Sequence, residues 1–487
     1  FCLTLPPQRA YNHFRPPLSL MYLSAALDKS GIPSAIIDPK IDEWKEELLA
    51  KAEAWTISEI RRLHPRYVGI SCYTNEYDRA MKAAKAVKQF DQDVIVVVGG
   101  IHPTIRPEDF FYEGTPVDIA VIGEGEKTIV ELVKAIEAKK NLGAIDGIAF
   151  MRGGRCCRTN PPCAVQNLDS IPMQAYENVD MSYYLTPNPF AIRGVFLSAF
   201  YMLITRGCPS NCNFCVNKNL RNVYAGGGAY FRFRSPENVL EEILYVKKKY
   251  SPDAFYIIDD AFTLRRDYVE KFCGLLCRNK AGLLWGCSTK VTAVDSDLLK
   301  KMKRAGCIQI DFGVESGSDE SLRRMKKGIT AGQIRKAFDL CRGAGIRTFA
   351  NILLNYPGET REDVIKTVEL LDKIRPSVVS LNIFLPYVGT DIYEESGLNL
   401  KKEEYSLFGA ESYDLIKDPR FRFAGHDIDF RQFFNEHHNR YNRPMNFIKG
   451  HVSPAYLGQL MKSRRKILYA RESIDLIRHF IKHSRKL

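Results

Sequence analysis

Three cysteines lie close together in the segment TRGCPSNCNFCVNK. They are Cys208, Cys212 and Cys215, spaced C-x3-C-x2-C, and no fourth cysteine stands near them. A structural zinc site takes four tetrahedral ligands, so the triplet would need another Cys or His from a distant part of the chain. Three thiolates would instead hold a cubane iron–sulfur cluster with one iron left open to a non-protein ligand. The spacing therefore favours an open cluster over a structural metal site.

The residues around the triplet predict where it lies. Residues 201–205 form an apolar strand that runs directly into the cysteine loop. Strands and helices then alternate through residues 196–390, with further strands predicted at 255–258, 284–288, 308–314, 348–354 and 378–384. Six βα units predict a partial (β/α)6 TIM-like barrel, with its site at the C-terminal ends of the strands. The cysteine loop is expected at that end.

Polar side chains follow other strands of the predicted barrel at the same end. Asp259 and Asp260 end the second strand, Lys290 lies just past the third, and Glu315 and Ser316 end the fourth. Because the C-terminal ends of parallel strands meet at one face of a barrel, we expect these residues near the triplet.

Residues 1–145 predict a separate domain. Apolar strands at 67–73, 94–98 and 119–122 alternate with helices at 76–90 and 126–138. Continuous apolar strands separated by helices indicate a parallel sheet covered on both faces, which is a doubly wound, Rossmann-like α/β fold.

Glycine-rich turns follow two strands of this domain, at the sheet edge where such folds bind ligands. The residues of these turns are Gly99, Gly100, Ile101, His102 and Pro103 after one strand, and Gly123, Glu124, Gly125 and Glu126 after the next. Glycine lets a bulky ligand approach the backbone, although a tight strand–helix turn needs glycine in any case. His102 by itself is read as a turn residue.

The rest of the chain divides into a Pro-rich linker at 146–195 and a mostly helical C-terminal region at 391–487. The segment 463–487 holds eight Lys and Arg residues against two acids, in a chain of net charge +13, and its apolar residues recur at helical spacing. It is therefore predicted to be a basic amphipathic helix. Packing on the body of the protein, an anionic lipid surface and nucleic acid are the three alternatives for it, in that order.

Composition predicts a globular protein without a membrane-spanning segment. The longest apolar run, residues 194–205, is too short to cross a bilayer. No signal peptide is recognised, and thirteen cysteines indicate a reducing, cytoplasmic compartment. The basic C-terminal helix would allow peripheral contact with the inner membrane surface. Cys156, Cys157 and Cys163 are not expected to hold a second cluster, because adjacent cysteines are poor co-ligands.

The cysteine motif and the barrel after it resemble the radical S-adenosylmethionine (SAM) enzymes. Phe214 stands just before the last cysteine, as in that family, and the segments 257–263, 313–318 and 349–360 resemble its SAM-binding strand ends. The resemblance implies that the three cysteines hold a [4Fe-4S] cluster whose open iron binds SAM. The residues that it assigns to SAM are Phe214, Asp259, Asp260, Lys290, Glu315, Ser316 and Leu354.

Residues 97–111 and 117–132 resemble the cobalamin-binding domain that precedes this barrel in one large subfamily. The residues that the resemblance assigns to cobalamin are Ser71, Cys72, Tyr73, Gly99, Gly100, Ile101, His102, Pro103, Gly123, Glu124, Gly125 and Glu126. No D-x-H-x-x-G segment supplies a lower histidine ligand. The resemblance therefore implies cobalamin bound with its own base displaced and without a protein histidine on cobalt.

In the methylating branch of this subfamily, one SAM yields a 5′-deoxyadenosyl radical and a second supplies a methyl group through cobalamin. We therefore expect a cobalamin-dependent radical methyltransferase acting on an unactivated carbon. Two alternatives stay open, a cyclase or other ring- or carbon–carbon bond-forming enzyme without net methyl transfer, and a sensor without turnover. The expected partners are a small-molecule or lipid-like substrate and an external electron donor of flavodoxin or ferredoxin type. Nucleic acid is not expected.

Overall fold

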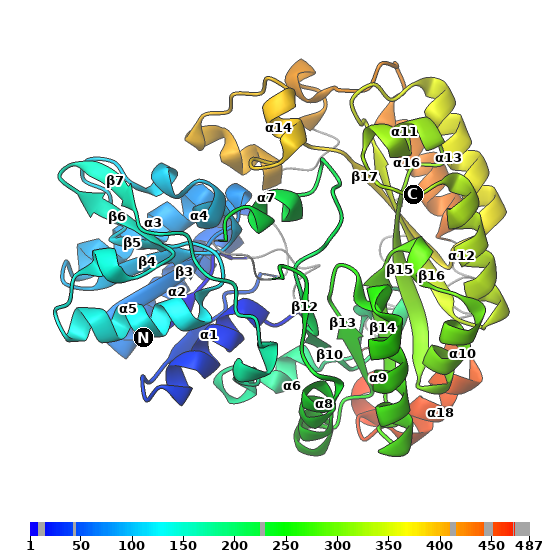
Figure 1. Ribbon diagram of the computed structural model, residues 1–487, viewed down its shortest axis with the longest axis horizontal. Helices are drawn as coiled ribbons and strands as arrows, with labels where there is room; N and C mark the ends of the chain where they lie inside the picture. The colour runs from blue at the N-terminus through cyan, green and yellow to red at the C-terminus, as the bar shows by residue number, and fades with distance from the viewer. Residues whose placement is uncertain are drawn as a thin grey trace.

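The computed structural model describes residues 1–7, 15–41, 45–224, 229–409, 415–442, 451–470 and 472. Two α/β bodies stand side by side in Figure 1, the N-terminal one in blue and cyan and the second in green and yellow. The α/β fold class is as predicted, a doubly wound domain followed by a partial barrel.

The N-terminal domain is built on a seven-stranded sheet of order β2-β1-β3-β4-β5-β6-β7. Its strands are β1 (Cys2–Thr4), β2 (Ala35–Ile37), β3 (Tyr67–Ser71), β4 (Ile95–Gly99), β5 (Ile119–Val121), β6 (Ile148–Arg152) and β7 (Arg155–Arg158). The first five strands pair in parallel, and β6 and β7 add an antiparallel edge. The sheet thus continues to Arg158, past the expected boundary at residue 145.

Helices cover both faces of this sheet, where two separate hydrophobic clusters form. They are α1 (Leu18–Lys29), α2 (Glu46–Leu63), α3 (Tyr77–Phe90), α4 (Ile101–Ile105) and α5 (Gly125–Glu137). In α3 the buried residues are Tyr77, Ala80, Ala84 and Val87, which recur every three or four positions.

The second body is a six-stranded parallel sheet of order β10-β13-β14-β15-β16-β17. The strands are β10 (Ala199–Met202), β13 (Ala254–Ile257), β14 (Leu284–Thr289), β15 (Cys307–Glu315), β16 (Arg347–Leu354) and β17 (Val378–Ile383). The first and last strands are not paired with each other, so the barrel is open on one side.

Helices follow the barrel strands and cover its outer face. They are α8 (Pro236–Tyr250), α9 (Arg266–Arg278), α10 (Ser296–Arg304), α12 (Ala331–Gly343) and α13 (Arg361–Ile374). Four of them begin at a side-chain cap that accepts a backbone amide, which satisfies donors of the first turn. The capping residues are Ser235, Asp295, Thr330 and Thr360.

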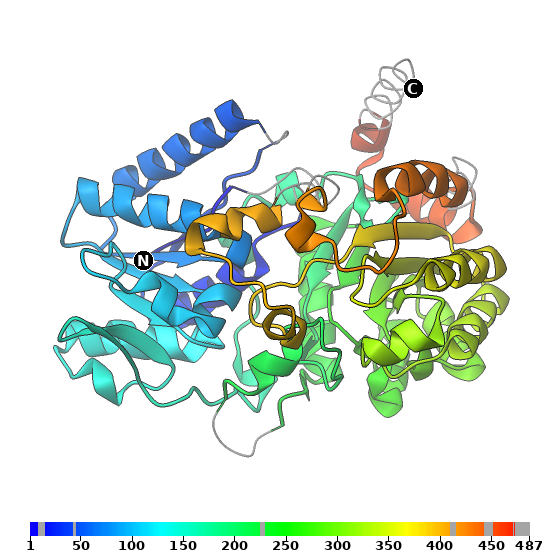
Figure 2. The ribbon, with the colours of Figure 1, turned by 90° about the horizontal axis from the view of Figure 1, so that it is seen from above.

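After the barrel, residues 386–409 and 415–421 cross back to the N-terminal domain and share its hydrophobic core. Figures 1 and 2 show this strap in orange between the two bodies. Tyr405 and Phe408 of the strap, in η9 (Lys402–Gly409), are buried with Tyr77 and Phe110 of the first domain. The strap therefore ties the two bodies together.

Two C-terminal helices, α16 (Phe430–Tyr441) and α18 (Pro454–Lys462), pack on the barrel. The segment around α18 lies at the N-terminal ends of the strands, where Ser463 and Tyr469 donate hydrogen bonds to Asp253, just before β13. Most of the predicted basic helix at 463–487 lies outside the described residues. Across the described chain, no helix combines the length and the hydropathy that a bilayer crossing requires.

Candidate active site

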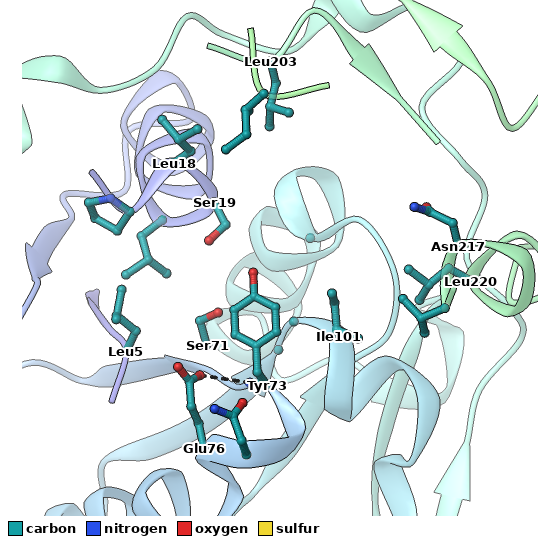
Figure 3. Close-up of a pocket in the computed structure, with 18 of the residues that line it drawn as sticks. Leu5, Leu18, Ser19, Ser71, Tyr73, Glu76, Ile101, Leu203, Asn217 and Leu220 are labelled. Atoms are coloured by element: carbon teal, nitrogen blue, oxygen red, sulfur yellow. Dashed lines mark hydrogen bonds between the residues drawn. The ribbon is translucent and has the colours of Figure 1, made fainter. Parts of the chain in front are cut away.

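A cavity of about 1220 Å³ lies between the two bodies. Its walls come from the turns after β3, β4 and β5 on one side and from the residues after β10 and β13 and at the ends of β15, β16 and β17 on the other. The C-terminal strand ends of both sheets therefore open into one space, as ligand sites of such sheets do. Figure 3 shows the part of it around Tyr73 and Leu203.

The N-terminal domain presents Tyr73 to the middle of this cavity. Tyr73 follows β3, and its backbone amide is held by the Glu76 carboxylate at 3.0 Å, so the ring projects between Ser71 and Ile101 (Figure 3). Tyr73 is 46% exposed. Desolvation by the protein around its hydroxyl raises the pKa of Tyr73. An uncharged aromatic side chain thus stands in the space between the bodies.

Gly100 lets the backbone turn sharply at the end of β4. Its φ is +102°, and an added Cβ would lie 3.1 Å from the Cys72 carbonyl oxygen, so a larger residue would be strained there. Gly99, Gly100 and Gly123 line the cavity with bare backbone, and Ile101 beside them adds an apolar side chain. This wall is suited to the close approach of a large flat ligand, which is what a corrin ring needs.

Three residues that the resemblance assigned to cobalamin, Cys72, His102 and Pro103, are buried and do not line the cavity. The His102 imidazole lies 3.1 Å from the Thr74 hydroxyl and 3.3 Å from the Asp109 carboxylate. Asp109 also accepts a hydrogen bond from Tyr405 of the strap. His102 is therefore part of the contact between the first domain and the strap.

No histidine of the described residues lines the cavity; His13, His479 and His483 lie outside them. The described side chains therefore offer no imidazole to a metal ion bound in the cavity.

The cysteine loop borders the cavity. Its lining residues Gly207, Phe214 and Val216 adjoin Cys208 and Cys215 in the chain. Cys208 and Cys212 are buried and Cys215 is half-buried, and all three are free thiols. Burial, together with nearby Asp260 and the other two thiols, raises the pKa of Cys215 to about 11. Within the described part of the chain no three His, Cys, Asp or Glu side chains are already gathered as metal ligands. The donor set, three neighbouring thiols in one loop, fits a cluster bound by three cysteines.

Asp259 holds the start of the cysteine loop. Its carboxylate accepts hydrogen bonds from the backbone amides of Ile204 at 2.9 Å and Thr205 at 3.0 Å. Burial raises the pKa of Asp259 to about 7, even though both amides favour its charged form. Asp260 faces the cavity and accepts a hydrogen bond from Asn217 at 2.8 Å. Both acids line the cavity, but Asp259 bonds the backbone of the cysteine loop and Asp260 bonds a side chain.

A polar ladder forms the barrel side of the cavity. The Glu315 carboxylate accepts hydrogen bonds from Lys327 at 2.6 Å and Asn351 at 3.2 Å, and Asn351 in turn accepts one from Asn382 at 2.9 Å. Lys327 also lies over the Phe214 ring, 5.6 Å from its centre. Glu315, Asn351 and Asn382 lie on the neighbouring strands β15, β16 and β17, and all three line the cavity. They offer hydrogen bonds to a polar ligand such as SAM.

The structure divides the residues assigned to SAM into two groups. Phe214, Asp259, Asp260 and Glu315 line the cavity, whereas Lys290, Ser316 and Leu354 do not. Ser316 faces α13, where its hydroxyl lies 3.2 Å from that of Thr367, and Leu354 is in the hydrophobic core. Its neighbour Leu353 lines the cavity instead, since successive strand residues face opposite sides of a sheet.

Sequence reasoning missed several lining residues. Asn351 and Asn382 could have been found as the strand positions next to core residues, because successive strand residues face opposite sides of a sheet. Tyr387 and Phe408, whose rings stack at 4.9 Å, line the cavity from the strap, and no local pattern marks them.

Two further groups of candidate ligands lie away from the cavity. His437 and His438 stand on α16, beside Phe433 and Phe434 of the same helix, and do not line it. Cys156 and Cys157 lie on the edge strand β7, and Cys163 is exposed.

Comparison with known proteins agrees with this two-part arrangement. The family model described as Radical SAM superfamily matches residues 202–371, and the one described as B12 binding domain matches residues 11–133. The fold and site thus define a radical SAM enzyme with a cobalamin-type domain in front of its barrel.

Curated relatives span most of the chain. An uncharacterized methyltransferase, PH0819 of Pyrococcus horikoshii, is 30% identical over 398 residues, 80% of this chain and 82% of the relative. The anaerobic magnesium-protoporphyrin IX monomethyl ester cyclase of Rubrivivax gelatinosus is 26% identical over 477 residues, 95% of this chain and 80% of that one. The chain belongs to the B12-binding domain-containing radical SAM enzyme family.

A solved structure shares the fold. The radical SAM methyltransferase TsrM from Kitasatospora setae, solved with cobalamin and a [4Fe-4S] cluster bound, superposes with a TM-score of 0.65 at 19% identity. The superposition covers 81% of this chain and 78% of TsrM. The two-domain architecture is therefore one that is known to hold both cofactors in another protein.

Proposed function

We propose that this enzyme methylates an unactivated carbon of a small-molecule substrate. The observation that carries the proposal is the single cavity into which the cysteine loop, the polar ladder of the barrel and the glycine turns of the first domain all open. When bound, the cluster with SAM supplies a carbon-centred radical and cobalamin supplies a methyl carrier. One shared space would let a substrate meet both.

The chain's own residues would bind and orient these groups. Cys208, Cys212 and Cys215 would hold the cluster. Asp260, Glu315, Asn351 and Asn382 would hold the polar parts of SAM, with Phe214 beside them. Ser71, Tyr73, Gly99, Gly100 and Ile101 would face cobalamin. Lys290 is left without a proposed contact, because it does not line the cavity.

The substrate would enter a mostly apolar part of the cavity. Leu203, Leu220, Ile383, Leu385 and Phe408 contribute its walls. Apolar lining with few polar groups is typical of sites that bind small apolar molecules, so the proposal includes an apolar or lipid-like substrate. The electron that the cluster needs would come from an external donor of flavodoxin or ferredoxin type.

A cyclase reaction without net methyl transfer is the second candidate, because three relatives are named as cyclases. The two reactions leave different products from SAM. Methylation yields S-adenosylhomocysteine beside 5′-deoxyadenosine, and a product about 14 Da heavier than the substrate, by the mass of one CH2. Cyclisation yields 5′-deoxyadenosine alone.

Anaerobic reconstitution with iron, sulfide and cobalamin tests whether the site turns over at all. We expect 5′-deoxyadenosine from the wild type with dithionite and SAM, and none from Cys208→Ala, Cys212→Ala or Cys215→Ala. The Cys163→Ala variant is the matched control, because Cys163 is exposed and far along the chain from the loop. Equal, background-level yields from all five proteins would support the sensor alternative instead.

Contact with an anionic membrane would use the segment around α18. Leu457, Met461 and Ile467 are 44%, 72% and 89% exposed, and the cations Lys462, Arg464 and Lys466 stand among them. Residues 451–470 contain no acid. Exposed apolar side chains among cations fit an anionic lipid surface. This segment lies at the N-terminal ends of the barrel strands, so docking there would leave the opposite, C-terminal end, where the cavity lies, away from the lipid.

Sedimentation with vesicles tests this surface. The wild type should pellet with phosphatidylglycerol vesicles and not with phosphatidylcholine vesicles, and Met461→Asp with Ile467→Asp should abolish the effect. The exposed Ile365→Asp on α13 is the control. Equal binding by all proteins, or binding by none, would refute the contact.

A further inference from the structure

Two arginines beside the cysteine loop face two glutamates of the N-terminal domain. Arg206 belongs to β11 (Thr205–Arg206) and Arg232 to β12 (Arg232–Phe233), and the two residues lie opposite each other in this antiparallel pair. Glu124 and Glu126 flank Gly125 at the start of α5. Like charges side by side on a ladder are unfavourable unless each has its own counter-charge.

Each arginine is joined to a glutamate by a forked pair of hydrogen bonds. Arg206 donates two to Glu126, one of them at 3.1 Å. Arg232 donates two to Glu124, at 3.0 and 2.6 Å, and a third to the Val165 carbonyl of the linker at 2.7 Å. The Glu124 carboxylate also accepts the Val165 amide. Forked pairs of this kind fix direction as well as distance.

All four side chains are largely buried. The exposed fractions are 16% for Arg206, 3% for Arg232 and 11% for each glutamate. The Arg206 guanidinium also lies over the Tyr22 ring of α1, 5.5 Å from its centre. In such surroundings the loss of one partner leaves a buried charge without its counter-charge, so the pairs resist separation.

The path from this cluster to the first cysteine is short and stiff. Gly207 alone separates Arg206 from Cys208, and its φ is +81°. An added Cβ on Gly207 would lie 2.5 Å from the Tyr230 carbonyl oxygen, so the backbone is closely confined there. A displacement of Arg206 would therefore be passed to the cysteine loop.

We infer that Arg206, Arg232, Glu124 and Glu126 form an interdomain clamp that sets the position of the cysteine loop relative to the strand ends of the N-terminal domain. The four are positioning residues for the two cofactor sites. Glu124 and Glu126, which the sequence assigned to cobalamin, have their carboxylate oxygens taken up by the arginines. The inference rests on family membership and on the clamp's geometry, and it holds for methylation and cyclisation alike.

The distance between the two cofactors reports directly on the positioning effect of the clamp. With bound Co(II) cobalamin and the one-electron-reduced cluster, pulsed dipolar electron paramagnetic resonance reports the distribution of their separations. We expect a narrow distribution in the wild type and a broader or shifted one in Glu126→Gln and Arg206→Gln. The double variant should add little to either single change, because residues of one pair act together.

Arg106 and Glu394 provide the matched control. This ion pair also joins the first domain to the strap, at 2.9 Å, but its side chains are 37% and 61% exposed. Glu394→Gln should leave the distance distribution as in the wild type, since exposed pairs contribute little.

The affinity for cobalamin distinguishes a positioning role of Glu126 from a role as a cobalamin ligand. The dissociation constant for hydroxocobalamin should change by less than about threefold in Glu126→Gln, as for a residue that does not touch the ligand. A loss of about tenfold or more with an unchanged distance distribution would make Glu126 a cobalamin ligand and overturn the inference. If Arg206→Gln fails to fold, Arg206→Lys replaces it, because lysine keeps the charge and cannot form the forked pair of hydrogen bonds. An unchanged distribution of cofactor distances in both Arg206→Lys and Glu126→Gln would also overturn the inference.

Discussion

The carboxylate of Glu315 and the ammonium of Lys327 meet at 2.6 Å beside the cavity that the two bodies share. Glu315 holds this position at a φ of +62°, a region that a non-glycine residue seldom adopts. Gly313 lies beneath the pair, where a Cβ would collide with both charged groups. Such a backbone is kept only where its surroundings fix it, so the pair is a constrained element of the barrel side.

Replacing Glu315 by Gln should weaken SAM binding and stability together. Lys327 would lose its counter-charge while it stays largely enclosed, and we expect the free energy of unfolding to fall by about 1–3 kcal/mol. Thermal unfolding and equilibrium dialysis with SAM measure the two effects. Lys327→Met in the same chain should restore part of the stability without restoring SAM affinity. Restoration of both would show that Glu315 acts only on the fold.

Asp259→Asn should release the start of the cysteine loop. An asparagine has one acceptor oxygen, so either Ile204 or Thr205 would lose its amide partner. We expect the iron content after reconstitution to fall by about half or more, since a buried amide left unpaired costs about 1–3 kcal/mol. Asp260→Asn is the control, because among the described residues Asp260 bonds the Asn217 side chain and no backbone amide. Equal iron content in both variants would contradict the anchoring role.

Acid should destabilise the barrel through Asp363. Burial alone would raise its pKa, but hydrogen bonds from Ser318, Thr360 and Arg324 outweigh burial and lower the pKa to about 2. A carboxyl whose pKa is lower in the folded state stabilises the fold above its unfolded pKa of about 4. That contribution is lost as the pH falls from about 4 to about 2. Thermal unfolding against pH should therefore be steeper in this range for the wild type than for Asp363→Asn, and parallel curves would refute it.

His102→Gln should leave bound cobalamin spectroscopically unchanged. The imidazole is fully buried against Thr74, Asp109 and the Tyr405 ring, away from the cavity. The visible absorption spectrum of the bound cofactor should match that of the wild type, while the midpoint of thermal unfolding falls. A shift of the cobalt absorption bands would place His102 on the metal after all.

The sequence could predict whatever is local. Apolar runs such as residues 94–98 mark their strand by themselves, and C-x3-C-x2-C marks its own chemistry. Parallel strand ends also converge by necessity, which is why Glu315 and Asp260 were found. The direction of a side chain along a strand was harder to predict. An error of one residue assigned Leu354 to the cavity in place of Leu353.

Long-range partners could not be predicted. The glycine turn at 123–126 looks the same whether its glutamates meet a ligand or Arg206 and Arg232, which lie more than 75 residues further along the chain. His102 likewise depends on Tyr405, about 300 residues away. A charged or imidazole side chain at a strand end takes its role from whatever packs against it, and that packing is set by the whole fold.

Products from labelled SAM test the central claim most directly. The reconstituted enzyme would be given dithionite, a metabolite and lipid extract, and SAM whose transferable methyl group carries three deuterium atoms. Methyl transfer to carbon predicts equal amounts of S-adenosylhomocysteine and 5′-deoxyadenosine, and a labelled product about 17 Da heavier than its precursor, by the mass of CD3 in place of hydrogen. A new product without deuterium, formed with 5′-deoxyadenosine and without S-adenosylhomocysteine, would contradict it.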